Sequence, residues 1–173
     1  MEGSAVIKQY VEYNENLEKN IEVLSKGAFL TTKTGNKVNS MSIAWGSIGF
    51  MWGKPIFMVM VRPQRYTYGI IEKTNEFTVT IPYKKMNKEI EFLGKNSGKD
   101  INKLLELKID TVESEKINTP ILAVEGMHFE CKVVYKTKMN EKNLEDVIKR
   151  YKYPLEDYHT LYFGEIVSSY TIK

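Results

Sequence analysis

The pattern of apolar and polar positions along the chain predicts a fold made mainly of strands. Strand-like composition or period-two alternation occurs in the segments 28–32, 56–61, 76–81, 127–138 and 161–171. A further strand is predicted over 38–48, returning after turn residues at 34–36. Pro55 and Pro63 bound the apolar run 56–61, because proline cannot donate to a strand ladder. That run is the best candidate for a buried core strand.

Helical spacing is confined to short segments. Apolar residues on one face predict a helix over 14–26, which Gly27 ends. Shorter helices are predicted over 140–151 and over 67–73, the latter with Thr67 as its N-cap.

The lysine-rich middle of the chain, 84–107, is expected to hold short helices around a loop at 94–98. No strand–helix–strand unit repeats, and no linker divides the chain. The pattern therefore favours a mainly β fold with short helices, a β-barrel of the α+β type, in a single domain over 1–173.

Composition narrows the classes of function. The chain has 173 residues, 42% hydrophobic and 27% charged, as expected for a globular protein with a real core. Its charge of +3 comes from 25 basic and 22 acidic residues that are interleaved, so no nucleic-acid partner is expected. No segment approaches the roughly 20 apolar residues that span a bilayer, and residues 1–4 precede no apolar stretch of signal-peptide length. We expect a cytoplasmic protein without a membrane partner.

The cysteine and histidines do not suggest hydrolytic or metal chemistry. Cys131 is the one cysteine and lies in a predicted strand, which favours a buried, inert thiol over a redox role. Cys131, His128 and His159 lack the spacing of a structural zinc site. His159 has no nearby serine or cysteine nucleophile, and no carboxylate pair or HExxH motif is present.

Two segments have residues suited to a polar ligand. Small hydroxyl and amide side chains at 39–47 would let a strand present backbone N–H groups to a flat ligand; the alternative is an ordinary solvent-facing strand. Trp45 and Trp52 are more typical of a core or subunit interface than of stacking on a ligand. Arg62 and Arg65, just before a predicted helix, suit a phosphate clamp to which Thr67 adds its hydroxyl; the alternative is a solvated turn.

The segment 94–100 has the composition of a phosphate-binding loop. It lacks the glycine spacing and the Lys-Ser/Thr ending of a Walker A loop, so a nucleoside triphosphatase is rejected. A helix-capping turn and a ligand contact both remain open for this segment.

Taken in order, these segments resemble the flavin reductase-like family, whose members adopt an FMN-binding split barrel and usually form homodimers. The matching stretches are GAFLTTKTGNKVNSMSIAWGSIGFMWGKP, VRPQRYT, NEFTVTIP, SGKD followed by Asn102 and Lys103, FECKVV and HTLYFGEIV. The sequence departs from the family at Ser42, where threonine is usual, and at Asn102, where aspartate often precedes the lysine. Both changes are mild and affect fine details of the site.

The resemblance implies a role for residues in each of the matching stretches. The flavin is expected to be lined by Asn39, Ser40, Met41 and Ser42 with Trp45 close by, its phosphate and ribityl side by Arg62, Arg65, Tyr66 and Thr67, and its edge by Ser97, Gly98, Asp100 and Lys103. His159 falls near the cofactor or the dimer interface. His159 is the one candidate for a catalytic role, and no other side chain is assigned as catalytic, because a flavin carries the redox chemistry itself.

The resemblance implies an oxidoreductase that passes electrons from NADH or NADPH to flavin. A GxGxxG fingerprint is absent, but a donor stacked on flavin needs no separate dinucleotide domain. Two alternatives stay open: a flavoredoxin-like FMN carrier reduced by a protein redox partner, and a non-catalytic split barrel that binds haem or another flat ligand. A homodimer is expected from the resemblance and from the apolar, aromatic stretch 48–60.

Overall fold

A computed structural model describes residues 6–173; the segment 1–4 considered above lies outside this range. Its strands are β1 (Lys8–Tyr10), β2 (Ala28–Thr34), β3 (Lys37–Ile43), β4 (Gly46–Met51), β5 (Lys54–Val61), β6 (Glu76–Pro82), β7 (Thr111–Val112), β8 (Ile121–Leu122), β9 (Gly126–Lys138) and β10 (Thr160–Ile172). Its helices are α1 (Leu17–Lys26), α2 (Tyr66–Thr74), α3 (Asn87–Lys95), α4 (Lys103–Leu107), the 3₁₀ turn η1 (Glu141–Asn143) and α5 (Asp146–Lys152). The mainly β architecture with short helices is confirmed.

One antiparallel sheet organises the molecule. Seven of its eight strands follow the order β3-β2-β6-β9-β10-β5-β4, and the eighth, β1, pairs with β10. The long strands β9 and β10 form the middle, and register shifts between them bend the sheet. The path ends at β3 on one side and at β4 on the other, although these strands follow one another in sequence.

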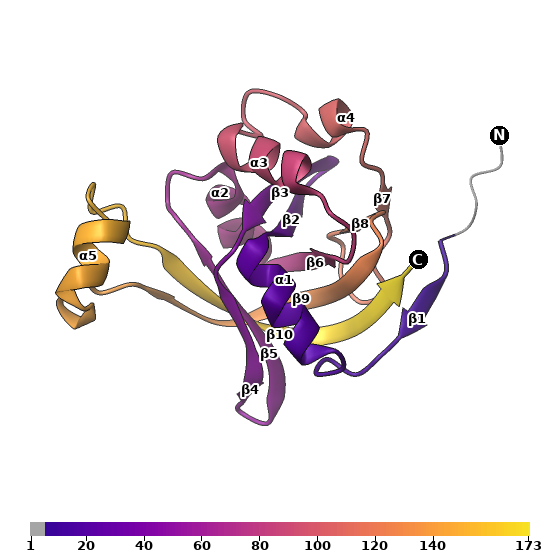
Figure 1. Ribbon diagram of the computed structural model, residues 1–173, viewed down its shortest axis with the longest axis horizontal. Coiled ribbons are helices and arrows are strands. Elements are labelled where there is room, and N and C mark those ends of the chain that lie inside the picture. The colour runs from indigo at the N-terminus through magenta and orange to yellow at the C-terminus, as the bar shows by residue number, and fades with distance from the viewer. Residues whose placement is uncertain (1–5) are drawn as a thin grey trace.

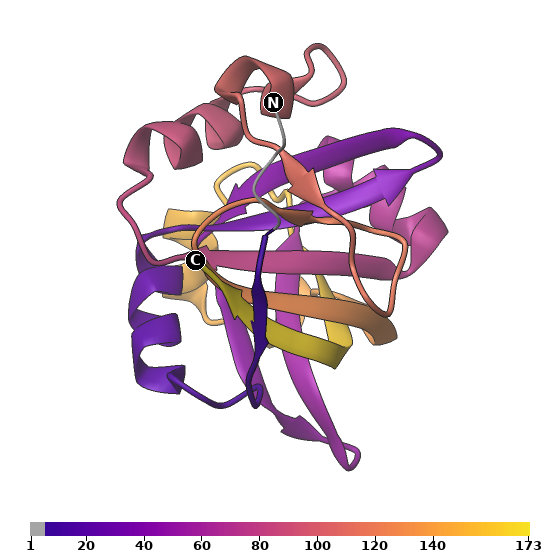
Figure 2. The ribbon, with the colours of Figure 1, turned by 90° about the vertical axis from the view of Figure 1, so that its right-hand side faces the viewer.

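Both faces of the sheet bury apolar side chains. Phe29 and Leu30 are neighbours in β2 and point to opposite faces, as successive strand residues must. Leu30 joins the main core inside the curve of the sheet, where Phe57 and Phe129 pack edge to face with ring centroids 5.2 Å apart. Phe29 joins a second cluster under α3 and α4, which cover β2 and β3 (Figure 2).

Two segments extend away from this body. The α5 segment stands apart at the left of Figure 1, and the β4–β5 hairpin reaches below the barrel. Within the described part of the chain, none of the helices is long and apolar enough to cross a membrane.

The single strand predicted over 38–48 is wrong, because the chain leaves the ladder at Ala44 and Trp45. β3 pairs with β2, whereas β4 pairs with β5 at the opposite end of the sheet path. The break lets the chain cross between these ends. Gly46 then lies so close to β5 that an added Cβ would be 3.0 Å from the Met58 carbonyl oxygen.

Three helix predictions and the start of the loop predicted at 94–98 also need correction. Arg65, with its extended backbone, is the N-cap of α2, and Thr67 lies inside the first turn. The helix predicted over 140–151 is divided into η1 and α5. The helix predicted over 14–26 begins only at Leu17, and Gly94 belongs to α3 rather than to the following loop. These segments are short and polar, so their apolar periodicity covers too few helical turns to define where a helix begins or ends.

The predictions for Cys131 and His128 as strand residues of structural character are confirmed. Burial, with Glu130 nearby, raises the pKa of the Cys131 thiol well above its ordinary value. His128 contacts Thr80 Oγ1 at 3.0 Å and the Val124 carbonyl oxygen at 2.9 Å. Burial lowers its pKa to about 4, so it is neutral at physiological pH.

Candidate functional site

The edge strand β3 forms the spine of the site. Only β2 pairs with it among the described residues, so its other long side presents backbone N–H and C=O groups away from the sheet. Helices α3 and α4 approach this side (Figure 2). Three adjoining cavities follow it, and we name each after one lining residue.

The Trp45 cavity, about 350 Å³ in volume, lies where β3 ends. Its walls come from the end of β3, from the turn between β5 and α2, and from the segment before β10. The lining residues are Met41, Ser42, Ile43, Ala44, Trp45, Met60, Arg62, Gln64, Arg65, Asp157 and His159. Aliphatic, aromatic and polar groups together suit a flat heterocycle with hydrogen-bonding edges.

Trp45 and His159 form an aromatic wall of this cavity. Their ring centroids are 5.5 Å apart, and Trp45 is 40% exposed whereas His159 is buried. The His159 Nδ1 lies 2.7 Å from the Tyr153 hydroxyl, which fixes the ring. Burial, reinforced by Arg62, lowers the pKa of His159 to about 4. The imidazole is therefore neutral at pH 7 and acts as a flat polar surface rather than as a cation.

Arg62 ties the α5 segment to the cavity. Its guanidinium forms an ion pair with Asp157 Oδ2 and donates to the Lys152 carbonyl oxygen at 2.9 Å. Gln64 donates to the same Asp157 oxygen at 2.7 Å. Burial opposes ionisation of Asp157, but these hydrogen bonds outweigh it and lower its pKa. The second oxygen, Oδ1, is buried without a hydrogen-bond partner in the described chain.

The Ser97 cavity is narrower, about 100 Å³, and adjoins the Trp45 cavity through Met41, Gln64 and Arg65. The residues that line it are Asn39, Met41, Gln64, Arg65, Tyr66, Thr67, Lys95, Asn96, Ser97, Gly98 and Lys103. They come from β3, from the start of α2 and from the loop between α3 and α4.

Two cations of the Ser97 cavity have no carboxylate partner among the described residues. Arg65 donates through both terminal nitrogens to the Gly94 carbonyl oxygen at 3.1 and 3.2 Å. Lys103 is 5% exposed, and its single hydrogen bond, to the Leu93 carbonyl oxygen, is long at 3.4 Å. Burial, then the positive charge of Arg65, lowers the pKa of Lys103 to about 8. Buried positive charge without a counter-ion is costly, so the cavity favours an anion.

The start of α2 adds to this preference. Arg65 caps the helix without a side-chain hydrogen bond, and no acidic residue lies in the first turn. Unpaired N–H groups at a helix N-terminus and the helix dipole both favour negative charge, and phosphate groups bind at such ends.

Asn39 and Gly98 fit closely on the floor of the Ser97 cavity. Asn39 donates to Thr67 Oγ1 at 2.9 Å, while its own Oδ1 is buried without a partner. A Cβ on Gly98 would lie 1.9 Å from that Oδ1, so no larger residue fits in this conformation. This explains why glycine follows Ser97.

The structure brings most of the residues predicted for the site together, but not all. Asp100 is exposed and lines neither cavity. Ser40 is fully buried, its hydroxyl contacting Thr31 Oγ1 and the Leu30 carbonyl oxygen, so its side chain serves the barrel. Arg62 lines the Trp45 cavity and not the Ser97 cavity, because Asp157 engages it. The predicted phosphate clamp therefore reduces to Arg65, joined by Lys103.

Sequence reasoning missed Gln64 and Asp157. Gln64 stands inside the matched stretch VRPQRYT, so its position was an available signal. Asp157 lies 95 residues from Arg62, and no local pattern pairs the two.

Comparison with known proteins agrees with this fold. The chain belongs to the flavin reductase-like family, since the family model for the flavin reductase like domain matches residues 25–173. An uncharacterised protein of Archaeoglobus fulgidus is 26% identical over 139 residues, covering 80% of this chain and 68% of that protein.

Two solved structures share the split-barrel fold. The flavoredoxin from Methanosarcina acetivorans superposes with a TM-score of 0.67 at 22% identity, covering 84% of this chain and 67% of that one. An FMN-binding domain of a flavin reductases-like enzyme from Shewanella baltica gives a TM-score of 0.68 at 19% identity, covering 98% of this chain and 79% of that one. The predicted family and the split-barrel fold class are thus confirmed.

Proposed function

We propose that this protein binds FMN along β3 and transfers electrons from NADH or NADPH to flavin. The observation that carries the proposal is the junction of two unlike cavities: the Trp45 cavity, with an aromatic wall and polar edges, opens into the Ser97 cavity, which holds cations without a counter-ion. FMN has a flat heterocycle at one end, which suits the Trp45 cavity, and a phosphate at the other end, which suits the Ser97 cavity. Family membership supports the same ligand class.

The residues present fit FMN in three respects. Arg65, Lys103 and the start of α2 would hold the phosphate, where charge-assisted hydrogen bonds are strongest. Trp45 and neutral His159 would bound the ring and exclude water from it. The unpartnered Oδ1 of Asp157 would accept a hydrogen bond from a ring N–H group.

When bound, FMN would supply the two-electron chemistry that the side chains themselves lack. The protein's part is to orient the ring, to keep one face open to a donor and to hold the phosphate. Because Trp45 is 40% exposed, we expect a nicotinamide to approach the ring past this residue.

The visible absorption spectrum of the purified protein tests flavin binding, followed by chromatography of the released chromophore. We expect FMN to be released, or to bind when added. Anaerobic addition of NADH or NADPH should then bleach the flavin absorption. If dithionite bleached the flavin absorption but neither NADH nor NADPH did, the flavoredoxin-like carrier would replace the reductase as the proposed function. Failure to bind any flavin would refute both functions.

We also propose a homodimer that uses the β4–β5 hairpin. Phe50 and Trp52 are 63% and 61% exposed there, and Trp52 packs against Tyr135 and Phe163 to extend the aromatic surface. Strand β4 is also an edge of the sheet, so no strand of the described chain pairs with its outer side. Light scattering should give twice the chain mass, and Phe50→Lys should shift it toward the monomer; a monomeric wild type with bound FMN would refute the dimer.

A further inference from the structure

Lys103 lies in the wall between two cavities. One is the Ser97 cavity. The other, which we name the Lys108 cavity, measures about 940 Å³ and lies along the first half of β3, between that strand and the α4–β7 segment. Lys103 lines both cavities, although it is only 5% exposed. A small molecule can therefore reach its amine from either cavity.

The Lys103 amine lies beside a second cation. It donates to the Leu93 carbonyl oxygen at 3.4 Å, whereas Arg65 donates to the next carbonyl oxygen, that of Gly94, at 3.1 and 3.2 Å. Both carbonyls belong to the last turn of α3, where the helix supplies no N–H partner for them. Successive carbonyls of one helix thus hold the two cations close together. Neither cation forms an ion pair within the described chain.

This environment makes Lys103 a nucleophile. Burial, then the positive charge of Arg65, lowers its pKa to about 8, so part of the population carries a neutral amine near neutrality. A lysine amine that is desolvated or lies next to another cation is activated to attack carbonyl carbon. The charged or titratable residues that share its two cavities are Lys37, Arg65, Tyr66, Lys95, Lys108 and Asp110. Cations predominate among them, so a reaction that turned the amine into an anion would relieve an excess of positive charge.

We propose that Lys103 of the flavin-free protein is a site of carbamylation by carbon dioxide. The lone pair of the neutral amine forms a C–N bond to CO₂, one C=O electron pair moves onto oxygen, and the nitrogen releases one proton to solvent. The product is a carbamate anion, and no oxidant or reductant takes part. Its carboxylate accepts hydrogen bonds from Arg65. Its N–H group is a donor in the cavity where Asn39 Oδ1 is buried without a partner.

Carbon dioxide suits this position better than a larger carbonyl compound. The Ser97 cavity measures about 100 Å³, and an added Cβ on Gly98 would lie 1.9 Å from Asn39 Oδ1, so there is little room beside the amine. The carbamate occupies the place proposed for the phosphate of FMN. Carbon dioxide and FMN therefore exclude each other, and this consequence alone rests on the proposed function.

Chemical trapping on the wild type tests the modification directly. Flavin-free protein is equilibrated with carbon dioxide at about pH 8, the carbamate is fixed by O-alkylation with a trialkyloxonium salt, and peptide mass spectrometry locates the adduct. We expect the adduct on Lys103, with a yield that rises with pH through about 8 and that excess FMN suppresses. Arg65→Ala removes the counter-ion of the carbamate and should lower the yield roughly tenfold.

Lys103→Arg separates a carbamate from a bicarbonate ion that is merely bound. The variant keeps the positive charge, but its guanidinium stays protonated and forms no carbamate. At fixed pH and ionic strength, carbon dioxide that modifies about nine-tenths of the wild type should lower its apparent FMN affinity about tenfold. The FMN affinity of Lys103→Arg should not respond to carbon dioxide.

Lys142→Arg is the matched control, because Lys142 is an exposed lysine of η1 that lines none of the three cavities. It should respond to carbon dioxide as the wild type does.

Two outcomes would overturn the inference. Absence of a Lys103 adduct at saturating carbon dioxide would refute the carbamylation, whether or not the protein binds FMN. An equal loss of FMN affinity in the wild type and in Lys103→Arg would assign the effect to bound bicarbonate instead. If the adduct formed on a protein that bound no flavin, the carbamylation would stand and the proposed function would fail.

Discussion

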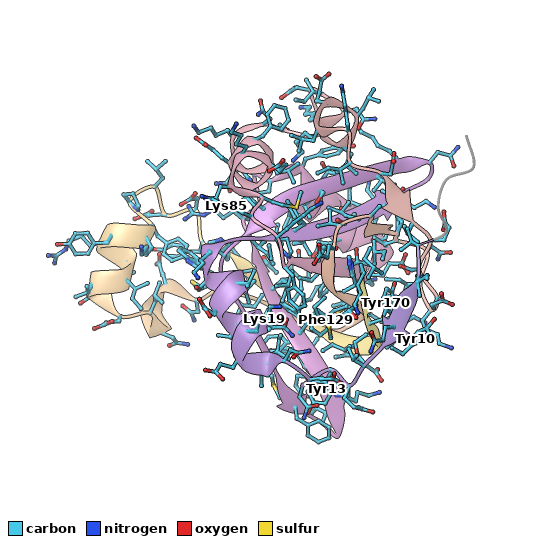
Figure 3. The ribbon with its side chains drawn as sticks, turned by 45° about the vertical axis from the view of Figure 1, so that its right-hand side comes forward. Tyr10, Tyr13, Lys19, Lys85, Phe129 and Tyr170 are labelled. Atoms are coloured by element: carbon cyan, nitrogen blue, oxygen red, sulfur yellow. The ribbon has the colours of Figure 1, made fainter. Side chains whose placement is uncertain are left out.

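Two regions of this barrel bury charged side chains, and they do so in opposite ways. In the first region, Glu130 of β9 is fully buried and accepts hydrogen bonds from the backbone N–H groups of Glu115 and Lys116 at 2.8 and 2.7 Å. The Tyr170 hydroxyl donates a third at 2.7 Å. Tyr170 lies beside Tyr10 near the C-terminus (Figure 3), with ring centroids 5.6 Å apart.

Glu76 of β6 repeats this arrangement one strand away. It accepts hydrogen bonds from the backbone N–H groups of Asn118 and Thr119 and from the Thr119 hydroxyl, at 3.0, 2.8 and 3.1 Å. Together the two carboxylates attach the segment 115–119 to the sheet. Every partner they need comes from the chain itself, which is the usual condition for buried charge in a structural role.

The second region, around the Ser97 cavity, lacks this completeness. Lys103 has one long hydrogen bond, Arg65 has only a carbonyl oxygen, and Asn39 Oδ1 has no partner. A folded chain tolerates such a cluster where a ligand completes it. The difference teaches that burial of a charge alone does not mark a site; the missing partner does.

The largest effect, a loss of stability, is expected in the first region, where the buried carboxylates have all their partners. Glu130→Ala leaves two backbone N–H groups and the Tyr170 hydroxyl without an acceptor in the core. Each orphaned donor costs about 1 to 3 kcal/mol, and partial relaxation brings the total to about 3 to 5 kcal/mol. Urea unfolding measures this loss.

Glu141→Ala, at an exposed position, is the control and should cost less than about 0.5 kcal/mol. FMN affinity of folded Glu130→Ala protein should match the wild type. A loss of affinity without a loss of stability would contradict the division between the two regions.

The next effect is expected at Arg65. Arg65→Ala removes a cation from the Ser97 cavity and should lower FMN affinity by about 1.5 to 3 kcal/mol, or roughly 10- to 150-fold. Riboflavin, which lacks the phosphate, should bind the variant and the wild type alike. Fluorescence titration with both ligands measures the difference.

Arg150→Ala is the matched control, since Arg150 is exposed on α5 and lines none of the cavities. If Arg65→Ala weakened riboflavin as much as FMN, the phosphate assignment would be wrong.

Much of this fold was predictable from sequence, because strands with strong apolar patterns such as 56–61 and 76–81 need no information from elsewhere in the chain. The break at Ala44 and Trp45 was not, since those residues do not interrupt the local pattern. They leave the ladder because β3 and β4 belong to opposite ends of the sheet path, which only the tertiary arrangement decides.

The site divides in the same way. The stretch VRPQRYT correctly located two arginines near a helix start, but it did not distinguish them. Arg62 is engaged by Asp157, 95 residues away, whereas Arg65 lines the Ser97 cavity with Lys103. Local spacing predicts where charge gathers; it does not predict which charge another part of the chain neutralises.

A smaller effect, of opposite sign for stability and binding, is expected at Lys103. Lys103→Met removes a buried, uncompensated cation, so the protein without flavin should be more stable at pH 7 by about 1 kcal/mol. FMN affinity should fall at the same time. Urea unfolding and FMN titration on the same samples test the pair of changes, and a variant that lost stability would show that the lysine is structural.

The dependence on pH follows from the pKa of Lys103, about 8 in the folded protein against an ordinary 10.5. Between these values the unfolded chain binds more protons than the folded one, so wild-type stability rises with pH there. The advantage of Lys103→Met should therefore be greatest below about pH 8 and vanish by about pH 10.5. Wild-type FMN affinity should fall as pH rises through about 8, while riboflavin affinity stays constant.

The smallest expected effect is at His159, where we predict that riboflavin affinity does not change with pH near neutrality. Its pKa of about 4 keeps the imidazole neutral above about pH 5, so it contributes no charge that titrates near neutrality. Riboflavin is the appropriate probe, because the phosphate of FMN itself titrates near pH 6. Riboflavin affinity should be constant between about pH 5 and 7 both in the wild type and in His159→Gln. The variant should bind riboflavin more weakly at every pH, because it lacks the imidazole that forms the aromatic wall with Trp45. The opposite result would be a riboflavin affinity that changes through about pH 6.5 in the wild type but not in His159→Gln. It would show that His159 ionises at the cavity, and that its buried charge, like that of Lys103, lacks a counter-ion.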